Sequence, residues 1–357
     1  MSLDEAATKP GASSKLDAGR KLEAGHKLEP GHKPHDRLAE ALSGEMAAVN
    51  ALIRERMASK HAPRIPEVTA HLVEAGGKRL RPMLTLAAAK LCGYQGKHHI
   101  ALAATVEFIH TATLLHDDVV DESTKRRGRP TANLLWDNKS SVLVGDYLFA
   151  RSFQLMIEAG SLRVLDILAD ASATIAEGEV LQLTAAQDLK TDEGIYLQVV
   201  RGKTAALFAA ACEVGAEISG VPKAQVQALR DYGDALGIAF QIADDLLDYG
   251  ASGGDIGKNI GDDFRERKVT LPVIKAHAAG DDAARAFWVR VIEAGEQREG
   301  DLERAQGLIE QSGAMAASRA VAMDWAGKAR KVLTLLPDHP LRAVLDDLAD
   351  YVVARLN

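Results

Sequence analysis

Apolar residues recur at spacings of three and four from about Asp36 to the end of the chain. This is the period of an amphipathic helix, and the alternation typical of half-buried strands is scarce. Glycine or proline separates the periodic stretches, so we expect short connections and antiparallel neighbouring helices. The pattern predicts an all-α fold, a single large helical bundle, with helices at 36–58, 79–92, 98–122, 141–158, 161–187, 192–213, 223–249, 269–278, 313–334 and 338–354.

The first 35 residues follow a different pattern. A six-residue unit recurs from Lys15 onward as KLDAGR, KLEAGH and KLEPGH. Each unit has a single leucine, which is too little apolar surface to offset the entropy lost on ordering. We therefore expect a disordered tail at 1–35, followed by one all-α domain at 36–357.

Composition narrows the classes of function. Hydrophobic residues make up 47% of the chain and its net charge is -7, which argues against nucleic acid as the main partner because phosphate backbones need a basic surface. Cys92 and Cys212 lie in alanine-rich stretches and are expected to be buried and reduced. No apolar run reaches 18 residues and no signal-peptide core is present, so we expect a cytoplasmic protein without a transmembrane segment.

Two acidic segments each follow an apolar helical run, at 117–121 and 244–248, and both have the spacing DDxxD. Carboxylates four residues apart lie on one helix face and repel each other, at the end where the helix dipole is also negative. Two such segments in apolar surroundings indicate cation binding. Hard oxygen ligands with open positions suit magnesium, with manganese as a substitute. The predicted metal-binding residues are Asp117, Asp118, Asp121, Asp244, Asp245 and Asp248.

Basic residues surround these segments. The stretch GGKRLRP at 76–82 opens a helix with Lys78 and Arg81 on one face, near the positive end of the helix dipole. A single lysine or arginine on a helix is usually a solvated surface charge. Arg126 and Arg127, which follow the first acidic segment, are equally consistent with the end of a helix. Their coincidence around both acidic segments nevertheless predicts a diphosphate site, with further contributions from Arg126, Arg127, Lys203, Thr204, Lys258, Lys268 and His110.

Taken together, these stretches resemble the trans-isoprenyl diphosphate synthases. The chain looks most like the long-chain polyprenyl members (octaprenyl, solanesyl and decaprenyl diphosphate synthases) that build bacterial quinone side chains. The matching stretches occur in the order of the family: GGKRLRP at 76–82, EFIHTATLLHDDVVDES at 107–123, RRGRPTAN at 126–133, LVGDYLFARSFQLM at 143–156, GEVLQL at 178–183, KTAALF at 203–208, FQIADDLLDY at 240–249, and GKNIGDDF through KVTLP at 257–272.

The resemblance implies the all-α isoprenoid synthase fold and assigns roles to individual residues. One departure is Arg267, which stands before Lys268 where the family usually has glycine, so the role of Lys268 is in doubt. The isopentenyl diphosphate pocket is implied to comprise Lys78, Arg81, His110 and Arg127. The allylic diphosphate contacts are Arg126, Lys203, Thr204, Gln241 and Lys258. The metal ligands are Asp117, Asp121 and Asp244, supported by Asp118, Asp245 and Asp248. The catalytic set is Asp117, Asp118, Asp121, Arg126, Lys203, Asp244 and Lys258.

The implied reaction joins isopentenyl diphosphate to an allylic diphosphate such as farnesyl diphosphate, with magnesium assisting ionisation. Thr113 and Ala112, four and five residues before Asp117, are small, whereas short-chain members tend to carry a bulky block there. The absence of a block predicts a product of eight to ten isoprene units. We expect a floor deeper in the tunnel, formed by Phe149 or Phe153, with Phe108 and Met156 as further candidates. A short-chain synthase and a terpene cyclase remain alternatives.

The resemblance also implies a homodimer, with transient membrane contact for product release.

Overall fold

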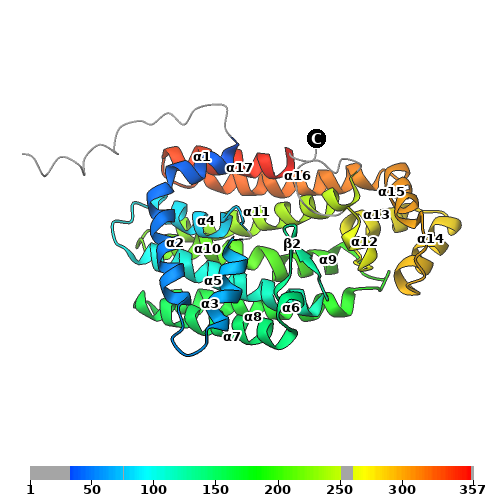
Figure 1. The fold of residues 1–357 in the computed structure, drawn as a ribbon. Coiled ribbons are helices and arrows are strands. Elements are labelled where there is room, and N and C mark those ends of the chain that lie inside the picture. The colour runs from blue at the N-terminus through cyan, green and yellow to red at the C-terminus, as the bar shows by residue number, and fades with distance from the viewer. Residues whose placement is uncertain (1–32, 75, 251–259, 355–357) are drawn as a thin grey trace, which may run out of the picture. The chain divides into compact units, whose positions relative to one another are not determined.

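The computed structural model describes residues 33–74, 76–250 and 260–354. All of them belong to the second of two compact units, Lys33–Asn357. The described residues are almost entirely helical, which confirms the all-α prediction (Figure 1). The predicted tail lies outside the described residues as far as residue 32, and the first helix begins at Pro34, two residues before the expected domain start.

The N-terminal half contains α1 (Pro34–Ala41), α2 (Ser43–Met57), α3 (Arg64–Glu74), α4 (Leu80–Leu91), α5 (His98–Val120), β1 (Lys125–Arg126), β2 (Arg129–Pro130), α6 (Ala132–Leu135), α7 (Asn138–Glu158) and α8 (Leu162–Ala185). The C-terminal half contains α9 (Glu193–Val200), the π-helix η1 (Arg201–Ala205), α10 (Ala206–Glu217), α11 (Lys223–Tyr249), α12 (Asp262–Arg265), α13 (Leu271–Ala279), α14 (Asp282–Trp288), the π-helix η2 (Val289–Glu293), α15 (Asp301–Gln311), α16 (Ala314–Leu333) and α17 (Pro340–Ala354).

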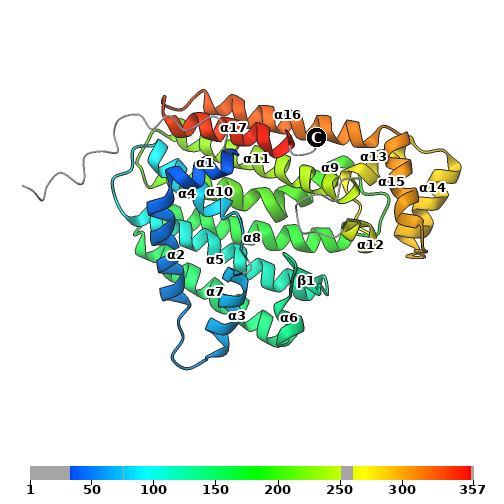
Figure 2. The same cartoon turned by 45° about the horizontal axis from the view of Figure 1, so that its top comes forward.

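Helix α10 lies at the centre of the bundle. Every residue from Leu207 to Ala216 is buried, because α4, α8 and α11 all pack against it. Glycine permits the closest of these contacts: a methyl group on Gly233 of α11 would lie 2.4 Å from the carbonyl oxygen of Phe208. In Figures 1 and 2, α16 and α17 run beside each other over α11, while α5 pairs with α7 on the other side of α10.

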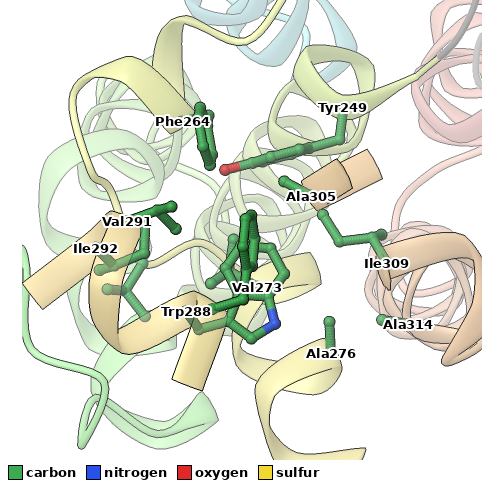
Figure 3. Packing of buried hydrophobic residues seen from close by; sticks show 12 residues of the cluster. Tyr249, Phe264, Val273, Ala276, Trp288, Val291, Ile292, Ala305, Ile309 and Ala314 are labelled. Carbon is green, nitrogen blue, oxygen red and sulfur yellow. The ribbon is translucent and has the colours of Figure 1, made fainter. Parts of the chain in front are cut away.

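A cluster of large side chains holds the C-terminal end of α11 against α13, α14 and α15. Tyr249 is the last residue of α11 and belongs with Phe264 and Trp288 to the buried cluster of Figure 3, where its hydroxyl points toward Phe264. The rings of Phe287 and Trp288 are 5.2 Å apart at their centroids. This packing fixes the end of α11, where the second acidic segment lies.

Most predicted helices match observed ones, and 223–249 matches α11 to the residue. The predicted helix 192–213 was wrong in one respect, because the π-helix η1 interrupts it. The predicted helix 36–58 is likewise divided at Leu42. Sequence periodicity missed α3, α6, α12, α14, η2, α15 and the short hairpin of β1 and β2.

Candidate active site

The first acidic segment occupies the C-terminal turn of α5. Asp117 is half-buried and Asp118 is completely buried, while Asp121 forms the C-cap of the helix. Burial raises the pKa of Asp117 to about 7, although the Lys203 ammonium opposes the shift. Burial also raises the pKa of Asp118, although its carboxylate accepts hydrogen bonds from Arg126 at 2.8 Å (Nε) and 2.7 Å (Nη2). This segment therefore holds negative charge that its surroundings only partly compensate.

A β-hairpin directs the two arginines that follow. Strands β1 and β2 are joined by Arg127 and Gly128, which both have positive φ (52° and 75°), as a two-residue type I′ loop requires. Arg126 reaches back to Asp118. The Arg127 guanidinium lies against Gly77, since a methyl group there would be 2.6 Å from its Nη1 atom. The pocket on this side is lined by His71, Leu72, Arg79, Glu107, Thr111, Leu114, Arg126, Arg127, Pro130 and Thr131.

Arg81 and His110 form a second basic group. The Arg81 Nη1 atom lies 3.2 Å from Nε2 of His110, and the guanidinium stacks over the Phe208 ring at 4.5 Å. Burial and the nearby Arg81 charge hold the pKa of His110 well below its usual value, so the ring is neutral. Arginine can only donate, so Nε2 of His110 accepts this hydrogen bond. His110 therefore orients Arg81 through this ring nitrogen.

The three carboxylates of the second acidic segment differ in their surroundings. Asp248 caps α12 by accepting hydrogen bonds from the backbone N–H groups of Asp262 (3.2 Å) and Asp263 (2.9 Å). Asp245 is also buried, and accepts a hydrogen bond from Tyr196 at 2.6 Å. Asp244 is half-buried. The structure thus shows Asp245 and Asp248 engaged by protein donors, as it does Asp118 in the first segment.

A pocket with a volume of about 110 Å³ lies beside this segment. Its wall brings together Lys203, Thr204 and Gln241, which the sequence analysis assigned to the allylic diphosphate. Thr204 donates a hydrogen bond to Gln241 at 2.8 Å. The complete lining is Gln182, Ala185, Ala186, Thr191, Tyr196, Val199, Val200, Lys203, Thr204, Gln241, Asp245, Asp263, Lys268, Val269 and Thr270.

A close helix crossing positions Lys203. A methyl group on Gly178 of α8 would lie 2.6 Å from the backbone nitrogen of Lys203 and 2.9 Å from Cα of Gly202. Lys203 belongs to the π-helix η1, an irregularity that is frequent at functional sites. Its ammonium pairs with Glu179 at 2.7 Å. Sequence reasoning missed Glu179 as a site residue, although it belongs to the matched stretch GEVLQL.

Lys268 lines the pocket and also pairs with the first acidic segment. Its Nζ atom lies 3.6 Å from Oδ2 of Asp121 and is also paired with Glu266. Burial opposes the charged form, but Asp263, Asp121 and Glu266 together raise the pKa of Lys268. The preceding Arg267 has a φ of 58°, the left-handed conformation that favours glycine. Arginine therefore retains the backbone geometry expected of glycine, and Lys268 faces the site.

The carboxylates fit a hard divalent cation. Their donor atoms are all oxygens, and the raised pKa of Asp117 reflects a burial cost that a nearby cation would relieve. Among the described residues, no group of three or more His, Cys, Asp or Glu side chains is arranged to hold a metal ion alone.

Several predicted site residues are not tested by this geometry. Lys258 lies outside the described residues, and Lys78 is exposed. Ala112 is buried and Thr113 half-buried on α5. Of the residues proposed for the tunnel floor, Phe108 and Met156 are fully buried and Phe149 is half-buried, but Phe153 is 41% exposed. Phe153 thus lies at the surface of α7 in the single chain, and its role in the tunnel floor stays a prediction.

Comparison with known proteins gives one consistent result. The family model "Polyprenyl synthetase" matches residues 62–309. Octaprenyl diphosphate synthase of Escherichia coli is 44% identical over 320 residues, covering 90% of this chain and 98% of that protein.

Two solved structures agree. A decaprenyl diphosphate synthase from Rhodobacter capsulatus is 74% identical with a TM-score of 0.88, covering 91% of this chain and 100% of that one. A polyprenyl synthase from Caulobacter crescentus, solved with calcium and isoprenyl diphosphate, is 52% identical with a TM-score of 0.87, covering 90% and 98%. These relatives do not favour the short-chain alternative.

Proposed function

The chain belongs to the polyprenyl synthetase family and is a prenyltransferase that makes long-chain trans-polyprenyl diphosphates, and from this premise we propose how its residues carry out the reaction. The substrates are isopentenyl diphosphate and an allylic diphosphate such as farnesyl diphosphate, and the product has eight to ten isoprene units. The observation that carries the proposal is the pocket that unites Lys203, Thr204, Gln241 and Lys268 beside the second acidic segment, with Lys268 also paired to Asp121 of the first.

The allylic diphosphate binds in this pocket. Lys203 and Lys268 supply positive charge, and Gln241 supplies an N–H donor, where the leaving group becomes more negative as the C–O bond breaks. Lys203 exchanges its present partner Glu179 for the diphosphate. Asp117, Asp121 and Asp244 would hold magnesium, or manganese in its place, and the metal would supply positive charge beside the leaving diphosphate.

Isopentenyl diphosphate binds on the other side of the first acidic segment. Arg81, oriented by His110, and Arg127, seated against Gly77, bind its diphosphate together with Lys78. The double bond then attacks the allylic carbocation, a new C–C bond forms, and pyrophosphate or a group near it takes the proton. Holding the two substrates close together in the reactive orientation accounts for much of the rate acceleration. The buried apolar surroundings keep water away from the carbocation.

The test is incorporation of radiolabelled isopentenyl diphosphate into farnesyl diphosphate with magnesium, resolved by reversed-phase chromatography. We expect a ladder that ends at eight to ten units and disappears when the metal is chelated. A ladder that stops at three or four units would contradict the long-chain product, and no incorporation would contradict the function itself.

We extend the proposal to assembly and location. Apolar side chains of α7 and α8 are exposed on the single chain, including Ile157 (67%) and Leu162 (84%), and such patches mark contact surfaces. They support a homodimer formed through α7 and α8. No helix in the described ranges is long and apolar enough to cross a membrane. We propose a cytoplasmic enzyme that contacts a membrane transiently to release its product, which serves as a quinone side chain.

A further inference from the structure

Tyr196 is a buried residue of the candidate pocket that none of the matched stretches includes. It belongs to α9, and its side chain is 5% exposed. Its hydroxyl donates a hydrogen bond of 2.6 Å to Oδ2 of Asp245, which is itself buried on α11. A buried carboxylate needs donors for its oxygens, since leaving one without a partner costs the full desolvation of that group. Tyr196 therefore fixes the orientation of the Asp245 carboxylate.

Asp245 in turn fixes the side-chain amide of Gln241. The other carboxylate oxygen, Oδ1, accepts a hydrogen bond from Nε2 of Gln241 at 2.8 Å. An ionised carboxylate can only accept, so the nitrogen of the amide must face Asp245 and its oxygen must face Thr204. This matches the hydrogen bond that Thr204 donates to Oε1 of Gln241 at 2.8 Å. The four side chains form one chain of hydrogen bonds along the pocket wall.

The orientation of the amide matters for binding an anion. An amide nitrogen carries two hydrogens, so Gln241 can give one to Asp245 and the second to a diphosphate in the pocket. If the amide were flipped, its oxygen would meet the diphosphate instead, and two acceptors would repel each other. The pocket can therefore recognise an anion through Gln241 only while Asp245 is held in place.

We propose that Tyr196 is a positioning residue for the allylic diphosphate, which acts through Asp245 to present an N–H group of Gln241 to the substrate. The inference rests on the proposed function, because it takes the pocket to be the allylic site. It assigns Asp245 to hydrogen bonding within the protein. It also explains why a tyrosine from α9, outside both acidic segments, is buried against the second one.

The test compares Tyr196→Phe with Tyr232→Phe in the full-length protein. Tyr232 is a matched control: it is also completely buried, and its hydroxyl donates a 2.8 Å hydrogen bond to the backbone oxygen of Leu345, away from the pocket. We expect Tyr196→Phe to raise KM for farnesyl diphosphate about tenfold, the effect of weakening one hydrogen bond to a charged group. KM for isopentenyl diphosphate should not change, and Tyr232→Phe should change neither constant.

A double-mutant cycle separates positioning from a general effect on the fold. If Tyr196 acts through Gln241, then Tyr196→Phe should add little to the KM of a Gln241→Ala variant. Thermal unfolding of both phenylalanine variants measures the structural cost. Equal KM values for Tyr196→Phe and Tyr232→Phe, or full additivity with Gln241→Ala, would overturn the proposal. Absence of prenyl transfer by the unmodified chain would instead refute the proposed function.

Discussion

Arg267 shows how one residue can depart from a family pattern without altering the backbone. Its φ of 58° is in the left-handed region, where a side chain costs about 1–2 kcal/mol. Its guanidinium lies against Gly295, where a methyl group would be 2.5 Å from Nη1. Packing at this contact offsets part of the strain, and the loop delivers Lys268 to the site.

We expect Arg267→Gly to be more stable than Arg267→Ala by about 1 kcal/mol, because both lose the guanidinium but only glycine relieves the backbone. Urea unfolding of the two variants measures the difference. The alanine variant is the control for lost packing. Equal stability of the two would mean that the left-handed conformation is not under strain.

His110 provides a prediction of pH dependence. Burial holds the pKa of His110 well below its usual value in the folded protein, so below about pH 6.5 the unfolded chain takes up a proton more readily than the folded one. Stability contributed by the neutral ring is thus present above this pH and is lost as the pH falls. The loss approaches about 1.4 kcal/mol per pH unit for one proton.

Replacing His110 with glutamine should remove this acid sensitivity, because an amide oxygen can still accept from Arg81 but cannot titrate. The measurement is urea unfolding between pH 7 and pH 5, comparing the slope of stability against pH. His61→Gln, at an exposed position, is the control and should leave the slope unchanged. An unchanged slope in His110→Gln would show that folding does not lower the pKa of His110.

The identities of the acidic residues were predictable from the sequence, but their individual partners were not. Spacing alone predicts that Asp244 and Asp248 lie on one helix face. It does not reveal that Asp248 accepts two backbone N–H groups from α12, because these contacts join residues 14 and 15 positions apart. Tyr196 was missed for the same reason: its partner Asp245 is 49 residues away.

At the scale of secondary-structure elements, the short irregular elements position several residues of the candidate site. The π-helix η1 presents Lys203 and Thr204, and the hairpin of β1 and β2 aims Arg126 and Arg127. Hydrophobic periodicity cannot predict either of them. A strand of two residues has no alternation to detect, and a π-helical turn changes the register of a helix without changing its composition.

The crossing of α8 and η1 at Gly178 leads to a prediction at this scale. Gly178→Ala would place a methyl group 2.6 Å from the backbone of Lys203, which cannot move as a flexible side chain could. We expect a loss of about 1–3 kcal/mol of stability and a higher KM for the allylic diphosphate, because Lys203 is displaced. Urea unfolding and steady-state kinetics measure the two effects.

Gly327→Ala is the matched control. Gly327 lies within α16, and a methyl group there would meet nothing within 4 Å. Since alanine is the better helix former, this variant should gain up to about 1 kcal/mol with unchanged kinetics. If Gly178→Ala behaved like Gly327→Ala, the close crossing would have no part in positioning Lys203.

At the scale of the whole molecule, the sequence predicts the all-α bundle well because helical periodicity and burial agree along most of the chain. The arrangement of α12 to α15 was less predictable. The cluster of Tyr249, Phe264 and Trp288 packs the end of α11 against α12 and α14, and Lys268, which follows α12, lies 3.6 Å from Asp121. Such contacts are set by three-dimensional packing, which a one-dimensional pattern does not encode.

The exposed apolar surface of α7 and α8 carries the last prediction. We expect the chain to be a dimer in solution, and Ile157→Glu to make it a monomer, because a charge buried without a partner in the interface is costly. Met323→Glu is the control: Met323 is similarly exposed (60%) but lies on α16. Light scattering after size exclusion measures the mass. If Ile157→Glu remains a dimer, or if Met323→Glu alone dissociates, the interface does not lie on α7 and α8.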